Sequence, residues 1–148
     1  MSTSTCTQAR ARKEALAGLV TATVLWLLPD RALAQEEVVL TQGKQEYLTH
    51  CATCHGLQGK GDGPMSDLWK KPPADLTQLS KKNKGQFPFW RVYRTIDGRE
   101  EVVAHGPRAM PVWGAHFLMQ AGGAPLDEHA VLGRILALVY YVESVQER

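Results

Sequence analysis

The stretch Tyr47–Pro64 reads YLTHCATCHGLQGKGDGP, and its pentapeptide CATCH brings together Cys51, Cys54 and His55. On a helix, residues at i, i+3 and i+4 project from the same face. Two thiols at this spacing can add to the two vinyl groups of a haem, while the adjacent histidine reaches the iron from the same side. C-x-x-C-H is the pattern of c-type haem attachment. The motif therefore predicts one covalently bound haem c, held by Cys51 and Cys54, with its iron ligated by His55.

Other uses of a paired cysteine motif fit this chain less well. The only further cysteine is Cys6, whereas a structural zinc site needs four ligands, usually with a second pair at similar spacing. The remaining histidines do not form such a pair; they are His50, His105, His116 and His129. A thioredoxin-like pair should follow a strand in a βαβ unit, which the sequence lacks, and so small a disulfide loop would add little stability.

The N-terminal segment resembles an export signal. Basic residues precede an uninterrupted apolar run, ALAGLVTATVLWLL, over residues 15–28, and small residues follow at Ala32 and Ala34. The run is shorter than the roughly 20 residues of a membrane span. We expect residues 1–34 to be a secretory signal, cleaved so that a domain of residues 35–148 begins at Gln35 in the periplasm. The alternative is an uncleaved membrane anchor.

Charge is balanced in the part of the chain that would remain after cleavage. The first 34 residues hold four basic and two acidic side chains, which leaves 13 basic and 13 acidic ones. With no net charge and no alternation of basic and aromatic residues, nucleic acid is not expected as a partner. The region Lys70–Arg94 is nevertheless strongly basic, since Asp75 is its only acidic residue. It is interpreted either as a face that steers an acidic redox partner or as a solvated loop.

Periodicity predicts an all-helical domain. A helix is expected from about Gln42 into the cysteine pair, with Thr41 as its N-cap. A second is expected where apolar residues recur from Phe89 to Ile96, ending at Gly98. The longest pattern follows Asp127 as N-cap; its apolar positions are Leu132, Ile135, Leu136, Val139, Tyr140 and Val142. The segments between, including residues 99–117, are expected to be loops, because Gly and Pro interrupt them.

A second axial ligand is expected opposite His55. Met110 is the preferred candidate because Pro111 follows it and restricts the backbone near the sulfur, and because 55 residues of chain suffice to wrap a haem. Met65 is close to His55 in sequence, and Met119 resembles an ordinary core or surface residue. His105 is the rival, and bis-histidine ligation would give a lower reduction potential than His/Met ligation.

These motifs resemble the class I c-type cytochromes, small monohaem electron carriers. The resemblance covers roughly Thr41 to Val145; it rests on GKQEYLTHCATCHG, GDGP, PADL, MPVWG and ILALVYYVESV. It implies an all-α cytochrome c fold, in which three to five helices surround one covalently attached haem. The N- and C-terminal helices of that fold cross where a glycine meets an aromatic residue. Gly43 and Tyr140 are the matching positions, with Tyr47 and Leu136 beside them.

The resemblance also implies that the Pro64 carbonyl accepts a hydrogen bond from His55 Nδ1, although Pro72 or Pro73 could serve instead. An apolar wrap around the haem is expected, formed by Leu68, Phe89, Trp90, Val112, Trp113 and Leu136. An iron with both axial positions filled passes single electrons rather than performing bond chemistry. The sequence therefore predicts an exported electron carrier, not an enzyme. Two alternatives stay open: a subunit docked to a dehydrogenase or oxidase, and an open-site haem protein that reduces peroxide or binds a gas.

Overall fold

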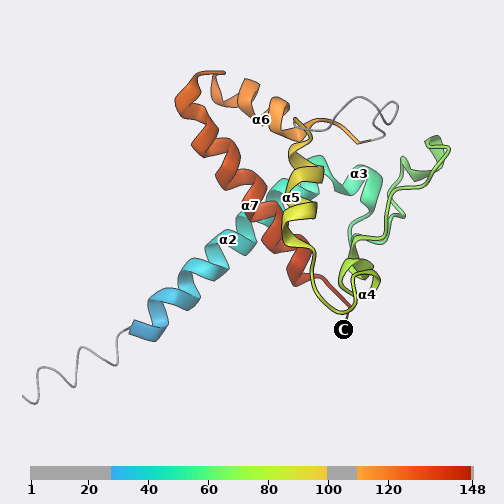
Figure 1. The fold of residues 1–148 in the computed structure, drawn as a ribbon, viewed down its shortest axis with the longest axis horizontal. Helices are drawn as coiled ribbons and strands as arrows, with labels where there is room; N and C mark the ends of the chain where they lie inside the picture. Colours follow the sequence, from blue (N-terminus) through green and yellow to red (C-terminus); the bar gives the residue numbers. More distant parts are fainter. Residues whose placement is uncertain (1–27, 100–109, 148) are drawn as a thin grey trace, which may run out of the picture. The chain divides into compact units, whose positions relative to one another are not determined.

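The computed structural model describes residues 28–99 and 110–147, and every regular element within them is helical. The chain divides into two units, residues 1–37 and 38–148. The elements, labelled in Figure 1, are α2 (Leu28–His50), α3 (Ala52–His55), η1 (Ser66–Leu68), η2 (Leu76–Gln78), α4 (Leu79–Lys82), α5 (Phe89–Asp97), α6 (Trp113–Ala121), η4 (Pro125–Asp127) and α7 (Glu128–Ser144). The all-α prediction is confirmed.

Helix α2 begins earlier than the sequence predicted. Thr41 was expected to cap a helix starting near Gln42, but α2 starts at Leu28 and Thr41 lies within it. Pro29 falls in the first turn, where a missing backbone N–H costs nothing because that group has no intrahelical partner. None of the described helices is long and apolar enough to cross a membrane.

The two helices predicted after the cysteine pair are both present. Helix α5 ends at Gly98, which takes a left-handed conformation (φ 68°) and donates its N–H to Arg94 O. Helix α7 follows Asp127, whose side chain accepts a hydrogen bond from Ala124 N rather than capping α7. The buried face of α7 differs from the predicted one: Leu132 and Tyr140 are exposed, and the core residues are Val131, Ile135, Leu138, Val139 and Val142.

Part of the segment predicted as loop is helical. Residues 99–117 were expected to be irregular, but α6 begins at Trp113. Gly114, in the first turn of α6, lies close to two side chains of the preceding segment. A Cβ there would meet the buried Asp97 carboxylate and would lie 2.6 Å from Arg99 Nε. Arg99 pairs with Asp97 and with Glu128, so the N-terminus of α6 packs on the ion pairs that join α5 to α7.

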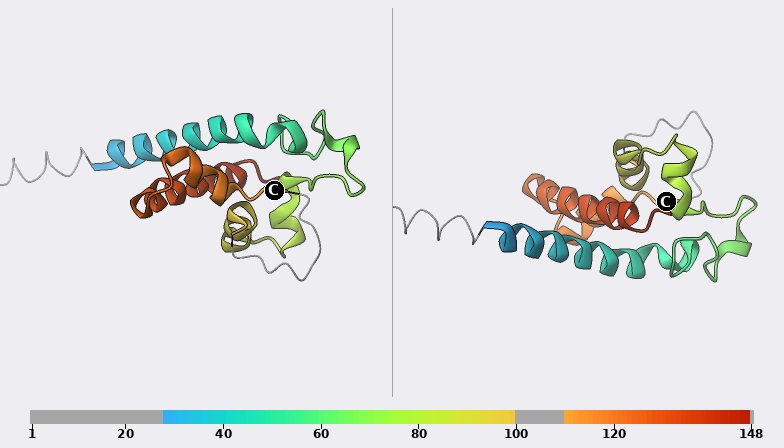
Figure 2. Two further views of the ribbon diagram at one scale, coloured as in Figure 1. Left: turned by 90° about the horizontal axis from the view of Figure 1, so that it is seen from above. Right: turned by 90° about the horizontal axis from the view of Figure 1, so that it is seen from below.

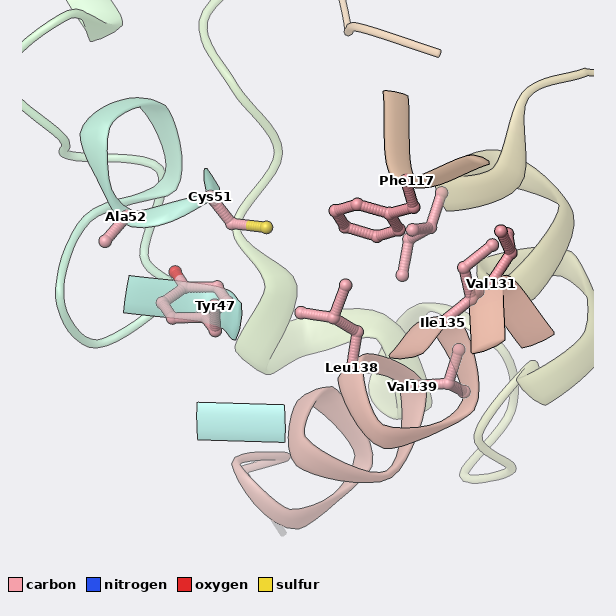
Figure 3. Close-up of a cluster of buried hydrophobic side chains, with 9 residues drawn as sticks. Tyr47, Cys51, Ala52, Phe117, Val131, Ile135, Leu138 and Val139 are labelled. Carbon is pink, nitrogen blue, oxygen red and sulfur yellow. The ribbon is translucent and has the colours of Figure 1, made fainter. Parts of the chain in front are cut away.

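The core lies where α7 packs against α2, α5 and α6. Tyr47, Cys51 and Ala52 enter it from the cysteine motif, and Figure 3 shows Cys51 among Tyr47, Leu138 and Phe117. Figure 1 shows α7 crossing α2, and the two helices lie next to each other in both views of Figure 2, as the approach of Gly43 to Ala137 requires. The cysteine motif is therefore part of the hydrophobic core rather than a separate surface loop.

A glycine allows close approach where α2 meets α7, but the aromatic partner was predicted one residue too early. A Cβ at Gly43 would collide with the backbone of Ala137 and lie 2.9 Å from Tyr141 Cβ. Tyr141 also packs on Tyr47, with ring centroids 5.1 Å apart. Tyr140 instead packs on Phe89 of α5. The contact is therefore Gly43 with Tyr141, because helix periodicity turns Tyr140 toward the other side of α7.

Candidate haem-attachment site

The cysteine motif forms a single tight turn after α2. Cys51 N–H donates to Tyr47 O (2.8 Å) and so continues the hydrogen bonding of α2. Cys54 N–H and His55 N–H both donate back to Cys51 O, at 3.1 and 2.9 Å. These bonds hold the three side chains on one helical turn, the arrangement predicted from their spacing.

The glycine-rich loop that follows satisfies the C-terminal carbonyls of α3. Gly61 N–H donates to His55 O, Gly63 N–H to Cys54 O and Met65 N–H to Thr53 O, over 2.8–3.2 Å. A Cβ at Gly63 would lie within 2.5–2.7 Å of this backbone. The GDGP sequence is therefore explained by close packing of the loop on the short helix, whose end carbonyls would otherwise have no partner.

The orientation of His55 is set by a carbonyl other than the predicted one. Its Nδ1 lies 2.9 Å from Ala74 O, whereas Pro64, the expected acceptor, is exposed. The next residue, Met65, donates its N–H to Thr53 O of α3 (3.0 Å). Ala74 directly follows Pro72 and Pro73, and Pro73 packs against Gly61. A donor at Nδ1 leaves the lone pair on Nε2, the tautomer that a metal ligand requires.

The two thiols are not bonded to each other and lie in different surroundings. Cys51 is 8% exposed, and Cys54 is half-buried. Burial, followed by the nearby Glu46 and Cys54, raises the pKa of the Cys51 thiol to about 12. A free Cys51 is therefore neutral at pH 7, which disfavours thiol–disulfide exchange.

A polar and aromatic network, which sequence reasoning missed, lies beside the motif. Arg134 of α7 pairs with Glu46 through two hydrogen bonds of 2.7 and 2.8 Å, and Glu46 lies 3.4 Å from His50 Nε2. The Arg134 guanidinium also lies over the Phe117 ring, 3.9 Å from its centroid. No local pattern indicates this network, since its members come from α2, α6 and α7.

Trp113, which was predicted to line the haem, lies at the edge of this network. Its ring is half-buried, 5.1 Å from the ring of His50 and 5.9 Å from that of Phe117, centroid to centroid. Burial lowers the pKa of His50, so the imidazole that packs on Trp113 is held in its neutral form. Phe89 and Val112 are half-buried as well, whereas Leu68 and Trp90 are exposed.

The methionines differ in their surroundings. Met110 packs against the core cluster, whereas Met65 and Met119 are 40% and 72% exposed. His105, the rival ligand, lies outside the described residues.

The residues on this turn fit a covalently bound haem. Two thiols that are not bonded to each other lie on the same turn as a histidine whose Nδ1 is engaged and whose Nε2 can bind iron. In the described part of the chain, no group of three or more His, Cys, Asp or Glu side chains could hold a metal ion. Two thiols and one imidazole on a single turn are the donor set of a thioether-linked porphyrin.

Comparison with known proteins agrees with this geometry. No curated protein and no solved structure matches the chain. The family model for cytochrome c oxidase, cbb3-type, subunit III matches residues 39–122, more than half of the chain, including the whole CATCH motif. That family binds covalent haem c and serves electron transfer. The chain is thus a c-type cytochrome and belongs to the cbb3-type subunit III cytochrome family.

Proposed function

We propose that the chain is an exported one-electron carrier whose haem is linked through Cys51 and Cys54 and whose iron is ligated by His55 and Met110. The bound haem supplies one-electron chemistry, since its iron alternates between the ferric and ferrous states. The chain's own residues attach the group, orient the imidazole and fill the remaining axial position. No site would then stay open for oxygen or peroxide.

The packing of Met110 carries the choice of second ligand. Of the three methionines after residue 34, Met110 alone packs against the core cluster that also contains Cys51. It stands three residues before α6, so the N-terminus of that helix restricts where its side chain can reach. A thioether ligand in an apolar environment favours ferrous iron and raises the potential, as a carrier between exported partners requires.

Met110→Ala in the purified holoprotein tests this ligation. The variant should keep its covalent haem but lose the methionine-to-iron absorption band of the oxidised protein. Its reduction potential should fall by on the order of 100 mV, within the range of about 0.8 V that axial ligands span. The measurements are optical spectra of both oxidation states and a potentiometric titration.

Met119→Ala and Met65→Ala are the matched controls, because both side chains are exposed. Both should retain the band. If the wild type lacks it, or if His105→Ala rather than Met110→Ala alters the spectrum, His/Met ligation is wrong. A high-spin, five-coordinate wild-type spectrum would support the open-site alternative.

Export is tested by the mass of the processed protein. The small residues Ala32 and Ala34 support cleavage after Ala34. The intact mass of the holoprotein should equal residues 35–148 plus one haem. A mass that includes residues 1–34 would support an anchored form instead.

A second candidate is a haem subunit docked to a larger oxidoreductase. It is favoured by the family description, which names an oxidase subunit, and by the exposure of the basic residues between Lys70 and Arg94. Salt-sensitive co-purification with a larger acidic complex would support docking. A free monomer at low ionic strength would support the mobile carrier.

A further inference from the structure

The last residues of the described chain are bonded to the segment that carries the His55 acceptor. Gln146 and Glu147, which we call the C-terminal clasp, follow α7 and reach residues 76–81 beside α4, where Figure 1 marks the C-terminus. The Gln146 side chain donates to Leu76 O (2.6 Å) and accepts from Ser80 N (2.9 Å). These bonds span about 70 residues of sequence, so they join two distant parts of the fold.

Glu147 strengthens the same connection. Its backbone N–H donates to Thr77 O (2.9 Å), and its carboxylate accepts from Gln78 Nε2 (2.6 Å). Lys81 Nζ lies 3.6 Å from the same carboxylate. The Gln78 and Lys81 contacts are exposed and contribute little each, whereas the Gln146 bonds are partly buried. Gln146 is therefore the principal member of the clasp.

The clasp closes on a residue that is already bonded to the haem-attachment loop. Leu76 N–H donates to Gly59 O (2.7 Å), four residues after His55. Leu76 is thus held on both sides: its N–H by the loop after CATCH and its carbonyl by Gln146. Asp75 adds local order, because its carboxylate accepts from Thr77 N (2.9 Å) and from Thr77 Oγ1 (2.6 Å).

Ala74 lies two residues before Leu76, and its carbonyl is 2.9 Å from His55 Nδ1. Ala74 itself is exposed and has no side chain that could anchor it. Its carbonyl is therefore positioned by the backbone on both sides, by Pro73, which packs against Gly61, and by Leu76, which the clasp holds. We propose that Gln146 is a positioning residue that holds the Ala74 carbonyl on His55 and so sets the reduction potential of the haem.

The chemistry follows from the role of the acceptor. A carbonyl on Nδ1–H increases the basicity of the imidazole, which makes it a stronger ligand for ferric iron. If the carbonyl moves away, the ferric state loses stabilisation and the potential rises. Loss of the direct hydrogen-bond partner of a ligating histidine typically lowers metal affinity or activity 10–100-fold. Because Gln146 acts only through Ala74, we expect its loss to change the ferric-to-ferrous equilibrium about threefold. This corresponds to a rise in reduction potential of about 30 mV, at 59 mV per tenfold change for one electron.

Gln146→Leu in the holoprotein tests this inference. The His55 Nδ1 proton of the reduced protein should exchange with solvent at least about threefold faster by NMR. The potential should rise, while the methionine-to-iron band stays unchanged. Gln42→Leu, an exposed glutamine on α2, is the matched control and should alter neither quantity.

Gln146→Glu distinguishes a positioning role from general destabilisation. It replaces Gln146→Leu in the test if that variant fails to bind haem. The carboxylate can still accept from Ser80 N but cannot donate to Leu76 O, so the exchange rate and the potential should change in the same direction. Unchanged exchange and potential in the variants, even with reduced stability, would overturn the proposal.

The inference rests on the proposed ligation of iron by His55, and the same spectra distinguish the two failures. Absence of haem-induced shifts on the His55 ring of the wild type would refute the ligation itself. Normal haem-induced shifts that do not change in the Gln146 variants would refute only the positioning role of Gln146.

Discussion

At the scale of single residues, the site depends on neutral groups held in apolar surroundings. Cys51 is buried in the core, and burial raises its pKa to about 12. Burial lowers the pKa of His50, despite the opposing effect of Glu46. Burial also lowers the pKa of His55, although the hydrogen bond to the Ala74 carbonyl opposes this change. Each group is thereby kept uncharged near neutral pH, which suits a turn that packs against a hydrophobic cluster.

His50 should make the stability of the holoprotein depend on pH. Its folded pKa is lowered, so below the ordinary histidine pKa of about 6.5 the unfolded chain binds a proton that the folded one excludes. Stability should therefore fall as the pH drops from 7 to 5. In His50→Gln this part of the decline should disappear, as measured by urea unfolding at both pH values.

The control for His50 is His129→Gln, which replaces an exposed histidine on α7. It should show the same decline as the wild type. If His50→Gln retains the full wild-type decline, the assignment to His50 is incorrect.

At the scale of helices, the two ends of the domain meet through one glycine. Gly43 lets α2 lie directly against the Ala137 backbone and Tyr141 of α7. The prediction of a helix crossing at Gly43 was correct in kind, but it named Tyr140, since both tyrosines lie in one apolar run. Only the rotation of α7 about its axis distinguishes them, and that rotation is set by packing against α2, α5 and α6 at once.

Gly43→Ala should destabilise the protein by about 1–3 kcal/mol, because overpacking at the crossing exceeds the helix-propensity gain of alanine. Gly133→Ala is the matched control on α7, where a Cβ would meet nothing within 4 Å. That variant should be stabilised by about 0.5–1 kcal/mol. The measurement is denaturant unfolding of both holoproteins; equal effects of the two substitutions would contradict the close crossing.

At the scale of the whole molecule, the haem turn, the core and the C-terminus form one connected structure. Cys51 belongs to the core cluster, and the glycine loop after His55 is bonded to Leu76, which the clasp joins to the end of α7. Attachment of the haem therefore affects the folding of the entire domain rather than that of one loop.

Cys51→Ala combined with Cys54→Ala should abolish covalent haem and leave a chain without a cooperative thermal transition, since a small domain built around a haem has little apolar core without it. Circular dichroism and intact mass measure both effects. Cys54→Ala alone keeps Cys51 and the one thioether that it can form. This variant should therefore retain haem and unfold cooperatively at a lower temperature than the wild type. A double variant with the wild-type transition would show that the fold does not depend on attachment.

The basic region between Lys70 and Arg94 should affect partner encounter. Lys82→Glu should slow reduction by an acidic partner at least about twofold at low ionic strength, through the association rate. Lys81 is unsuitable for this test because it contacts Glu147. Lys44→Glu on α2 changes the net charge equally and should leave the rate unchanged. Stopped-flow kinetics at two salt concentrations measure the rate of reduction. Equal slowing by both variants would show that the basic region is not a specific docking face.

The sequence by itself determined the chemistry and the helical class. Cys51, Cys54 and His55 are close along the chain, so hydrogen bonds within one turn suffice to bring them together. Helices α5 and α7 follow from local periodicity, and Gly98 ends α5 as predicted. Local patterns were misleading where a distant partner decides the structure. Residues 99–117 were expected to be a loop, yet α6 begins at Trp113, and its Gly114 lies directly against the Asp97 and Arg99 side chains.

Only the tertiary structure decided which groups support the site. The acceptor for His55 is Ala74 rather than Pro64, and Gln146 holds the following residues in place from the other end of the chain. A backbone carbonyl has no side-chain signature, and any of several residues near the prolines could supply one. The choice depends on how long-range packing directs the chain, which residue spacing near the motif does not encode.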